Sequence, residues 1–180
     1  MSTSFAQQYG PWALVTGASS GIGQAIARQL AARGLNLILC ARNAQALDEQ
    51  AEELRQQHEI DAQPLALDIG ASDFVTKLVD GIGDRDLGLV VSNAGFGLKG
   101  LHIDQDPNEL DAMLAVNARA PMQIIRAFAP QLIQRGRGGF ILTGSMEGYM
   151  GFPLSAAYSA TKGFVHFLGE AMWQELKPHN

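Results

Sequence analysis

Short apolar runs alternate with longer helical segments along the chain, and this alternation constrains the fold more than any other feature. The apolar runs cover residues 12–16, 35–40, 64–67, 87–92 and 139–143. Between and after them, apolar residues recur every three or four positions over residues 21–33, 44–58, 71–82, 107–135 and 155–176. Strands that are apolar throughout are typical of a parallel sheet covered by helices on both faces. The sequence therefore predicts an α/β fold with a doubly wound parallel sheet.

A glycine-rich turn follows the first predicted strand directly, as Thr16-Gly17-Ala18-Ser19-Ser20-Gly21-Ile22-Gly23. In such a turn the first glycine permits a tight bend, the second lets a phosphate approach the backbone, and the third allows close packing of helix on strand. The start of the following helix offers free N–H groups and a positive dipole to a pyrophosphate. We therefore expect Gly17, Ser19–Ile22 and Gly23 to bind a dinucleotide. A turn made for packing alone is the alternative.

The end of the second predicted strand indicates which dinucleotide is preferred. Enzymes that use NAD usually carry Asp or Glu there, about 20 residues beyond the glycines, to bind the ribose 2′-hydroxyl. This chain has Cys40-Ala41-Arg42-Asn43 instead. The Arg42 guanidinium would pair with the 2′-phosphate of NADP, so NADP(H) is preferred over NAD(H). The alternative is that Arg42 is a solvated loop residue, and Ser20 supplies no second cation.

Tyr158 and Lys162 stand at positions i and i+4 of the last predicted helix, so they share one face. A phenol titrates near 10, and a nearby ammonium favours its anion, which makes Tyr158 a candidate general acid or base. Ser145 follows the last predicted strand, on the sheet edge that faces ligands in doubly wound folds, and could donate to a substrate carbonyl. The turn Asn93-Ala94-Gly95 ends the fourth strand on that edge, where a cofactor could lie close to the backbone. A surface hydrogen bond would explain the Tyr158–Lys162 spacing equally well.

Pro121 lies inside the long helical segment 107–135 and has no N–H to donate. The carbonyl of Asn117, four residues earlier, therefore loses its helical partner, and the helix should bend there. A freed carbonyl could hold a water that links Lys162 to solvent and resupplies protons to Tyr158. A packing kink with a solvated carbonyl is the alternative.

These motifs together resemble the short-chain dehydrogenase/reductase family over essentially the whole chain. The resemblance implies a Rossmann-like fold, with Asp68, beside Ile69, at the adenine-binding position and Ser92 replacing the first Asn of the family's Asn-Asn-Ala-Gly. It assigns a catalytic tetrad to four residues, Asn117, Ser145, Tyr158 and Lys162.

By that resemblance the reaction is reversible hydride transfer between a nicotinamide and a carbonyl or alcohol carbon. Tyr158 is then the acid/base, Ser145 positions the oxygen, and Lys162 lowers the pKa of Tyr158 and binds the nicotinamide ribose. Residues 9–17 and 157–162 look most like the branch with 3-oxoacyl and 17β-hydroxysteroid reductases, which implies a bulky apolar ketone or alcohol.

The sequence departs from the family pattern at its end, because members continue after the tetrad helix with further strands and a substrate lid. We therefore expect residues 1–180 to form one nucleotide-binding domain, truncated at its C-terminus, with strand order 3-2-1-4-5 and the last strand at an edge. A chain that binds dinucleotide but is catalytically impaired, and acts as a binding or interaction module, is the alternative function. The segments 107–135 and 155–176 are expected to form a homo-oligomer interface, as is common in the family.

Charge and cysteine content narrow the classes of partner. Thirteen Lys and Arg against eighteen Asp and Glu give a net charge of −5, with no basic stripe for nucleic acid or anionic lipid. A single cysteine, Cys40, and four scattered His predict neither a disulfide framework nor a metal site. The first ten residues lack a signal-peptide pattern and no apolar stretch suits a membrane span, so we expect a cytoplasmic protein without a membrane partner.

Overall fold

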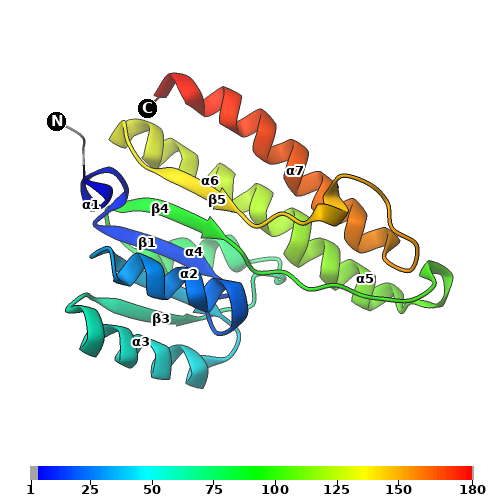
Figure 1. Cartoon of the computed structure of the whole chain (residues 1–180), viewed down its shortest axis with the longest axis horizontal. Coiled ribbons are helices and arrows are strands. Elements are labelled where there is room, and N and C mark those ends of the chain that lie inside the picture. The colour runs from blue at the N-terminus through cyan, green and yellow to red at the C-terminus, as the bar shows by residue number, and fades with distance from the viewer. Residues whose placement is uncertain (1–3, 180) are drawn as a thin grey trace.

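A single five-stranded parallel sheet organises the chain, whose computed structural model describes residues 4–179 (Figure 1). The strands are β1 (Trp12–Thr16), β2 (Asn36–Ala41), β3 (Ala62–Ala66), β4 (Leu87–Ser92) and β5 (Gly139–Leu142). Their order in the sheet is β3-β2-β1-β4-β5, which confirms the predicted doubly wound topology. Residues 1–3 and 180 lie outside the described residues. They include both ends of the predicted domain 1–180 and the start of the N-terminal stretch that lacks a signal-peptide pattern.

The helices follow the predicted segments with three differences. They are α1 (Phe5–Tyr9), α2 (Gly21–Ala31), α3 (Ala44–His58), α4 (Phe74–Ile82), α5 (Pro107–Leu114), α6 (Ala120–Arg135) and α7 (Ala156–Leu176). Short 3₁₀ turns are η1 (His102–Asp104), η3 (Met146–Gly148) and η4 (Lys177–His179). The helix α1 was not predicted, because its five residues are too few to establish an apolar period. The helix predicted from residue 71 begins at Phe74, since the Gly70 N–H bonds back to Asp68 in a turn.

The third difference lies in segment 107–135, which is helical throughout as predicted but is not α-helical throughout. A π-helical turn, η2 (Ala115–Arg119), separates α5 from α6, and Pro121 stands in the first turn of α6. Pro121 cannot donate to the carbonyl of Asn117, and a wider turn is one way for the chain to continue past the lost bond. The distortion was expected at this place, but as a bend rather than as a π turn. It leaves the Asn117 side chain buried.

Alternate residues of the strands face two separate cores. Ala13 and Val15 of β1 belong to the core beneath α2 and α3, whereas Leu14 belongs to the core beneath α4 and α6. All three side chains are fully buried. Helices on both faces of the central strands explain why these strands are apolar throughout. The two helical layers hold the carboxyl ends of β1 and β4 rigidly in the middle of the sheet.

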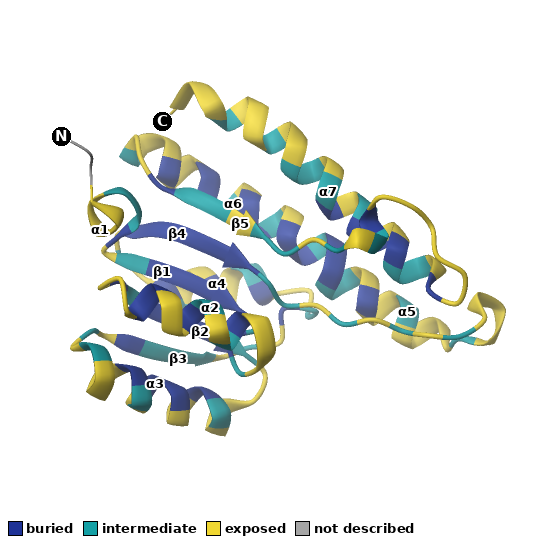
Figure 2. Cartoon of the chain, viewed as in Figure 1, coloured by how far each residue is buried: buried dark blue, intermediate teal, exposed yellow. Residues whose placement is uncertain are grey.

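The side of the sheet formed by β5 is less covered than the centre (Figure 2). β5 pairs with β4, and within residues 4–179 no strand pairs with its other edge. A groove of about 420 Å³ lies between β5, α6 and α7. Its apolar lining includes Phe140 and Leu142 of β5 and Met172 and Trp173 of α7. The expected exposed edge strand is therefore present, and α7 does not cover it completely.

Candidate active site

All five strands run parallel, so their carboxyl ends meet at one edge of the sheet, and a cleft of about 710 Å³ opens there. The cleft collects residues from the carboxyl ends of all five strands and from the first turns of α7. Nearly all the residues proposed from the sequence line it: Gly17, Ser19, Ser20, Gly21, Ile22, Arg42, Asp68, Ile69, Asn93, Ala94, Gly95, Ser145, Tyr158 and Lys162. Gly23 and Asn117 are the two proposed residues that do not line the cleft.

The glycine turn forms a cradle that larger residues would fill. Gly17 has a φ of +67°, and a Cβ added to it would lie 2.8 Å from the Ala94 Cα. A Cβ added to Gly23 would overlap the Gly17 carbonyl oxygen, so Gly23 serves the packing of the turn. Ser20 is the N-cap of α2, yet its side chain makes no capping bond. The first N–H groups of α2 thus remain available to an anionic ligand, and the cradle fits a pyrophosphate.

Thr16, which the sequence analysis did not single out, connects the ends of three strands. Its Oγ1 donates to the Val91 carbonyl at 3.3 Å and accepts from the Asn93 N–H at 3.0 Å. The Asn93 side-chain amide donates to the Thr16 carbonyl at 3.1 Å and accepts from Thr143 Oγ1 at 3.0 Å. These bonds fix Asn93 between β1 and β5. In the sequence, the place of Thr16 as the polar last residue of an otherwise apolar strand could have indicated this role.

Lys162 is buried at the floor of the cleft beside Tyr158. Its side chain reaches the end of β5, where Nζ donates to the Thr143 carbonyl at 2.8 Å. The same Nζ lies 5.8 Å from the centre of the Tyr158 ring. Lys162 is only 5% exposed, and burial lowers the pKa of its ammonium below the ordinary 10.5. The predicted pair thus shares a helix face and a cleft, which favours chemistry over a surface contact.

Ser145 lies at the start of η3, on the same side of the cleft. Its Oγ accepts a hydrogen bond from the Glu147 N–H at 3.2 Å. Because Oγ is the acceptor in this bond, the hydroxyl hydrogen remains available for a substrate oxygen. Ser145 and Tyr158 therefore both present hydroxyl donors to one cleft.

Asn117 acts from behind the cleft. It is 1% exposed, and its Nδ2 donates to the Phe96 carbonyl at 2.8 Å and to Thr161 Oγ1 at 3.2 Å. Its Oδ1 accepts from the Phe96 N–H at 3.1 Å. A Cβ added to Gly95 would lie 3.1 Å from Asn117 Oδ1 and 3.6 Å from Lys162 Nζ. Asn117 Oδ1 and Lys162 Nζ thus both approach Gly95 where a side chain would project, and the Asn117 amide ties the loop after β4 to α7.

Arg42 and Asp68 lie at the ends of β2 and β3, at the far end of the cleft from Tyr158. Both are exposed. Asp68 Oδ1 accepts from the Gly70 N–H at 2.9 Å, which fixes the carboxylate in its turn. No ion pair occupies the Arg42 guanidinium within residues 4–179, so it is available to an anionic group.

Several residues of the site were missed in the sequence. Phe96, Gly97, Val116, Thr143 and Gly144 also line the cleft, along with Cys40, Ala41, Asn43 and Leu67. A Cβ added to Gly97 would lie 3.2 Å from the Tyr158 ring, so this glycine gives the ring its space. Most of these residues lie next to a motif identified in the sequence, and only that neighbourhood could have indicated that they line the cleft.

Comparison with known proteins agrees with this geometry. The family model described as short chain dehydrogenase matches residues 11–180. The chain belongs to the short-chain dehydrogenase family. Very-long-chain 3-oxoacyl-CoA reductase-A from Danio rerio is 32% identical over 172 residues, which cover 93% of this chain and 54% of the relative. The chain thus spans about half the length of this curated relative.

Solved structures place this short-chain dehydrogenase among similar folds. The bulky-bulky ketone specific alcohol dehydrogenase from Comamonas testosteroni superposes with a TM-score of 0.91 at 31% identity, covering 96% of this chain and 70% of that one. A metagenomic short-chain oxidoreductase in complex with NADP superposes with a TM-score of 0.89 at 35% identity, covering 96% of this chain and 79% of that one.

Within the described part of the chain, no helix is both long and apolar enough to cross a bilayer. Nor do its His, Cys, Asp and Glu residues gather into a group that could hold a metal ion.

Proposed function

We propose that the chain is an NADP(H)-dependent oxidoreductase that interconverts a carbonyl group and a secondary alcohol on an apolar substrate. One observation carries the proposal: the glycine cradle, Arg42, Ser145, Tyr158 and Lys162 all line a single cleft. Arg42 at one end of the cleft, the phosphate-binding turn between, and the acid/base pair at the other end match the adenosine ribose, the pyrophosphate and the nicotinamide of a dinucleotide. The bound nicotinamide would supply or accept the hydride.

The chain's own residues handle the proton. Ser145 donates its hydroxyl hydrogen to the substrate oxygen and orients it toward Tyr158. Tyr158 gives a proton to that oxygen during reduction, or takes one during oxidation. The Lys162 ammonium, 5.8 Å from the ring centre, favours the phenolate that remains. It also retains donors beyond its bond to Thr143 with which to hold the nicotinamide ribose.

The proton given up by Tyr158 must be replaced from solvent. A water on the Asn117 carbonyl, in the π turn, would connect Lys162 to solvent. Asn117 Oδ1 and Lys162 Nζ both lie within 3.6 Å of a Cβ added to Gly95, so the π turn that carries the Asn117 carbonyl passes close to Lys162, which supports this route. Pro121→Ala restores a donor to the helix, so we expect slower turnover and an altered pH profile. Unchanged turnover with an unchanged profile would refute the water relay.

NADP(H) rather than NAD(H) is proposed because Arg42 lines the cleft and forms no ion pair within residues 4–179. The neighbour solved with NADP supports binding of a nicotinamide dinucleotide. Asp68 and Ile69 line the part of the cleft where the adenine would lie.

A bulky apolar substrate is proposed from the segment between Ser145 and Tyr158. Met146, Tyr149, Met150 and Phe152 are exposed there, next to η3. The names of two similar proteins, a bulky-bulky ketone specific dehydrogenase and a very-long-chain 3-oxoacyl-CoA reductase, point to the same class. Oxidation of NADPH in the presence of aromatic, steroid-like and 3-oxoacyl ketones, measured for the wild type and Tyr158→Phe, tests the function.

A second candidate is a module that binds dinucleotide with little turnover. The open edge of β5 and the apolar groove beside it favour this candidate. Calorimetry that detects NADPH binding, with no turnover of any ketone tested, would support it. Robust turnover would refute it.

Self-association through α5, α6 and α7 is part of the proposal. Met122 and Ile133 of α6 and Phe164, Phe167 and Trp173 of α7 are exposed. A second copy of the chain would bury these side chains, and sedimentation that detects only monomer at micromolar concentration would count against it. The cytoplasmic location and the lack of membrane and nucleic-acid partners stay predictions.

A further inference from the structure

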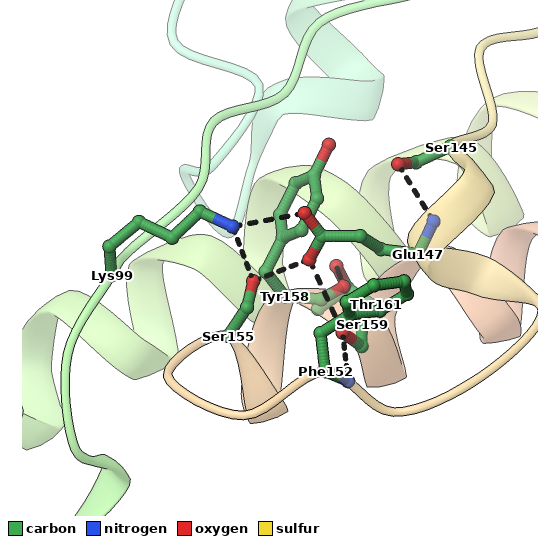
Figure 3. Close-up of polar contacts among 8 residues, drawn as sticks. All are labelled: Lys99, Ser145, Glu147, Phe152, Ser155, Tyr158, Ser159 and Thr161. Carbon is green, nitrogen blue, oxygen red and sulfur yellow. Dashed lines mark hydrogen bonds and ion pairs between the residues drawn. The ribbon is translucent and has the colours of Figure 1, made fainter.

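A carboxylate that the proposed mechanism does not use lies beside Tyr158. Glu147 of η3 is partly exposed, with 23% of its side chain accessible. Its Oε2 accepts from Ser155 Oγ at 2.5 Å and from Ser159 Oγ at 3.3 Å (Figure 3). Its Oε1 forms an ion pair with Lys99 Nζ at 2.9 Å. Three polar side chains therefore meet at the Glu147 carboxylate, and together with Glu147 they come from three separate segments.

The three segments are those that surround Tyr158. Lys99 belongs to the loop after β4, Glu147 to the turn after β5, and Ser155 and Ser159 to the start of α7. Lys99 also donates to Ser155 Oγ at 2.9 Å, so the cluster is closed on itself. Forty-eight residues separate Lys99 from Glu147, which is why no spacing in the sequence revealed the pair.

The carboxylate takes the place of a helix-capping bond at the start of α7. Ser155 is the N-cap residue of α7, but its hydroxyl bonds to Glu147 instead of capping a helix N–H. The carboxylate thus lies at the positive end of the helix that carries Tyr158. The hydrogen bond from Ser155 and the ion pair with Lys99 lower the pKa of Glu147, which keeps it charged at neutral pH.

The Lys99 ammonium is also close enough to Tyr158 to influence the ionisation of its phenol. Its Nζ lies 5.8 Å from the centre of the Tyr158 ring, the same separation as Lys162 Nζ. The two ammonium groups differ in their partners, because Lys99 is paired with a carboxylate whereas Lys162 is bonded to a neutral carbonyl. The charged groups near the phenol are thus Lys99 from the β4 loop, Glu147 from η3 and Lys162 from α7.

We propose that Glu147 and Lys99 are positioning residues for Tyr158, which clamp the start of α7 to the loop after β4 and balance the charge near the phenol. Glu147 removes the excess positive charge that Lys99 would otherwise add to that of Lys162. The role of Glu147 and Lys99 in turnover rests on the proposed function, whereas their effect on the ionisation of Tyr158 does not.

The test uses Glu147→Gln, Lys99→Met and the double variant of the full chain. The absorbance change of phenol ionisation is recorded against pH in each variant, and the same background with Tyr158→Phe is subtracted to isolate Tyr158 from the other two tyrosines. Glu147→Gln leaves Lys99 unpaired and should move the Tyr158 midpoint to lower pH. Lys99→Met leaves Glu147 unpaired and should move it to higher pH. The two shifts are expected in opposite directions because the two substitutions remove charges of opposite sign.

Opposite shifts that cancel in the double variant support the proposal, because loosened packing would move both single variants the same way. Shifts in one direction, or none, overturn it. Asp73→Asn is the control, since it breaks the exposed Asp73–Lys77 pair (2.7 Å) on α4 without touching this cluster. Lys99 is 65% exposed, so its variants should fold even if Glu147→Gln does not.

Turnover distinguishes this proposal from the proposed function. Glu147→Gln and Lys99→Met should lower kcat about tenfold with little change in the KM for NADPH, and Lys99→Arg should restore most of it. If Tyr158→Phe keeps full turnover, the proposed function fails while the titration still decides the charge balance. If Tyr158→Phe is inactive and the titration midpoints do not move, the proposed function stands and this proposal fails.

Discussion

The Lys162 ammonium is joined to the Thr143 carbonyl by a 2.8 Å hydrogen bond, which ties α7 to the end of β5. The bond places a buried cation beside the Tyr158 ring, and Ser145 lies two residues beyond its acceptor. The position of Lys162 relative to the cleft is therefore fixed by the sheet as well as by the helix. Its charge is retained at a cost in stability, since burial lowers its pKa.

Lys162→Met tests that cost. The unfolded chain holds the Lys162 proton up to its ordinary pKa of 10.5, whereas the folded chain releases it at lower pH. Between the folded and the unfolded pKa the unfolded state binds more protons, so the contribution of Lys162 to the free energy of unfolding rises with pH. Denaturant unfolding at several pH values should find that the wild type gains stability relative to Lys162→Met as pH approaches 10.5. A difference that stays constant or falls would contradict the assigned desolvation.

Gly23→Ala should damage the glycine cradle. Its Cβ would overlap the carbonyl of Gly17, which is backbone and cannot rotate away. We expect a loss of about 1–3 kcal/mol in the free energy of unfolding, together with weaker NADPH binding. Gly151→Ala is the matched control, because no atom lies within 4 Å of its added Cβ. Equal behaviour of the two variants in denaturant unfolding and calorimetry would argue against the cradle.

Arg42→Ala tests the preference between the two dinucleotides. A charge-assisted hydrogen bond contributes about 1.5–3 kcal/mol, so NADPH binding should weaken about 10- to 150-fold. NADH lacks the 2′-phosphate, and its affinity should change little. Arg126→Ala on the surface of α6 serves as the control. If calorimetry finds that NADPH and NADH weaken by the same factor, Arg42 does not read the 2′-phosphate.

Cys40 is expected to be inert in the folded protein. It is fully buried in β2, and burial raises the pKa of its thiol to about 12. The thiolate is the reactive form, so iodoacetamide at pH 8 should modify the chain only after unfolding. Since Cys40 is the single cysteine, intact mass after alkylation gives the answer directly. Rapid modification of the native chain would show that the β2 core opens readily.

The sequence predicted the parts of the fold that local pattern controls. The bounds of β1, β4 and α3 agree with the predicted segments, because apolar runs and a helix cap mark them clearly. The predicted helical segment 107–135 has the right bounds and a distortion at the expected place, but its apolar period continues through the π turn and so does not reveal the change in helix type. The helix α1 was missed because five residues carry too little pattern.

The site residues also fall into those that a local motif predicts and those that it does not. Gly17, Arg42, Tyr158 and Lys162 stand in short motifs whose spacing has a chemical reason, and the structure brings them to one cleft. The Lys99–Glu147 pair and the Thr16 network depend on contacts between segments far apart in the chain. Only the strand order brings those segments together, so no local pattern could reveal them.

The central claim is that Tyr158 transfers the proton in an NADPH-dependent reduction. Its most direct test is the rate of NADPH oxidation with a bulky apolar ketone, for the wild type and for Tyr158→Phe at equal NADPH saturation. Because Phe keeps the ring but lacks the hydroxyl, we predict that kcat falls about 10²- to 10⁴-fold while NADPH still binds. Turnover by Tyr158→Phe at the wild-type rate would contradict the account.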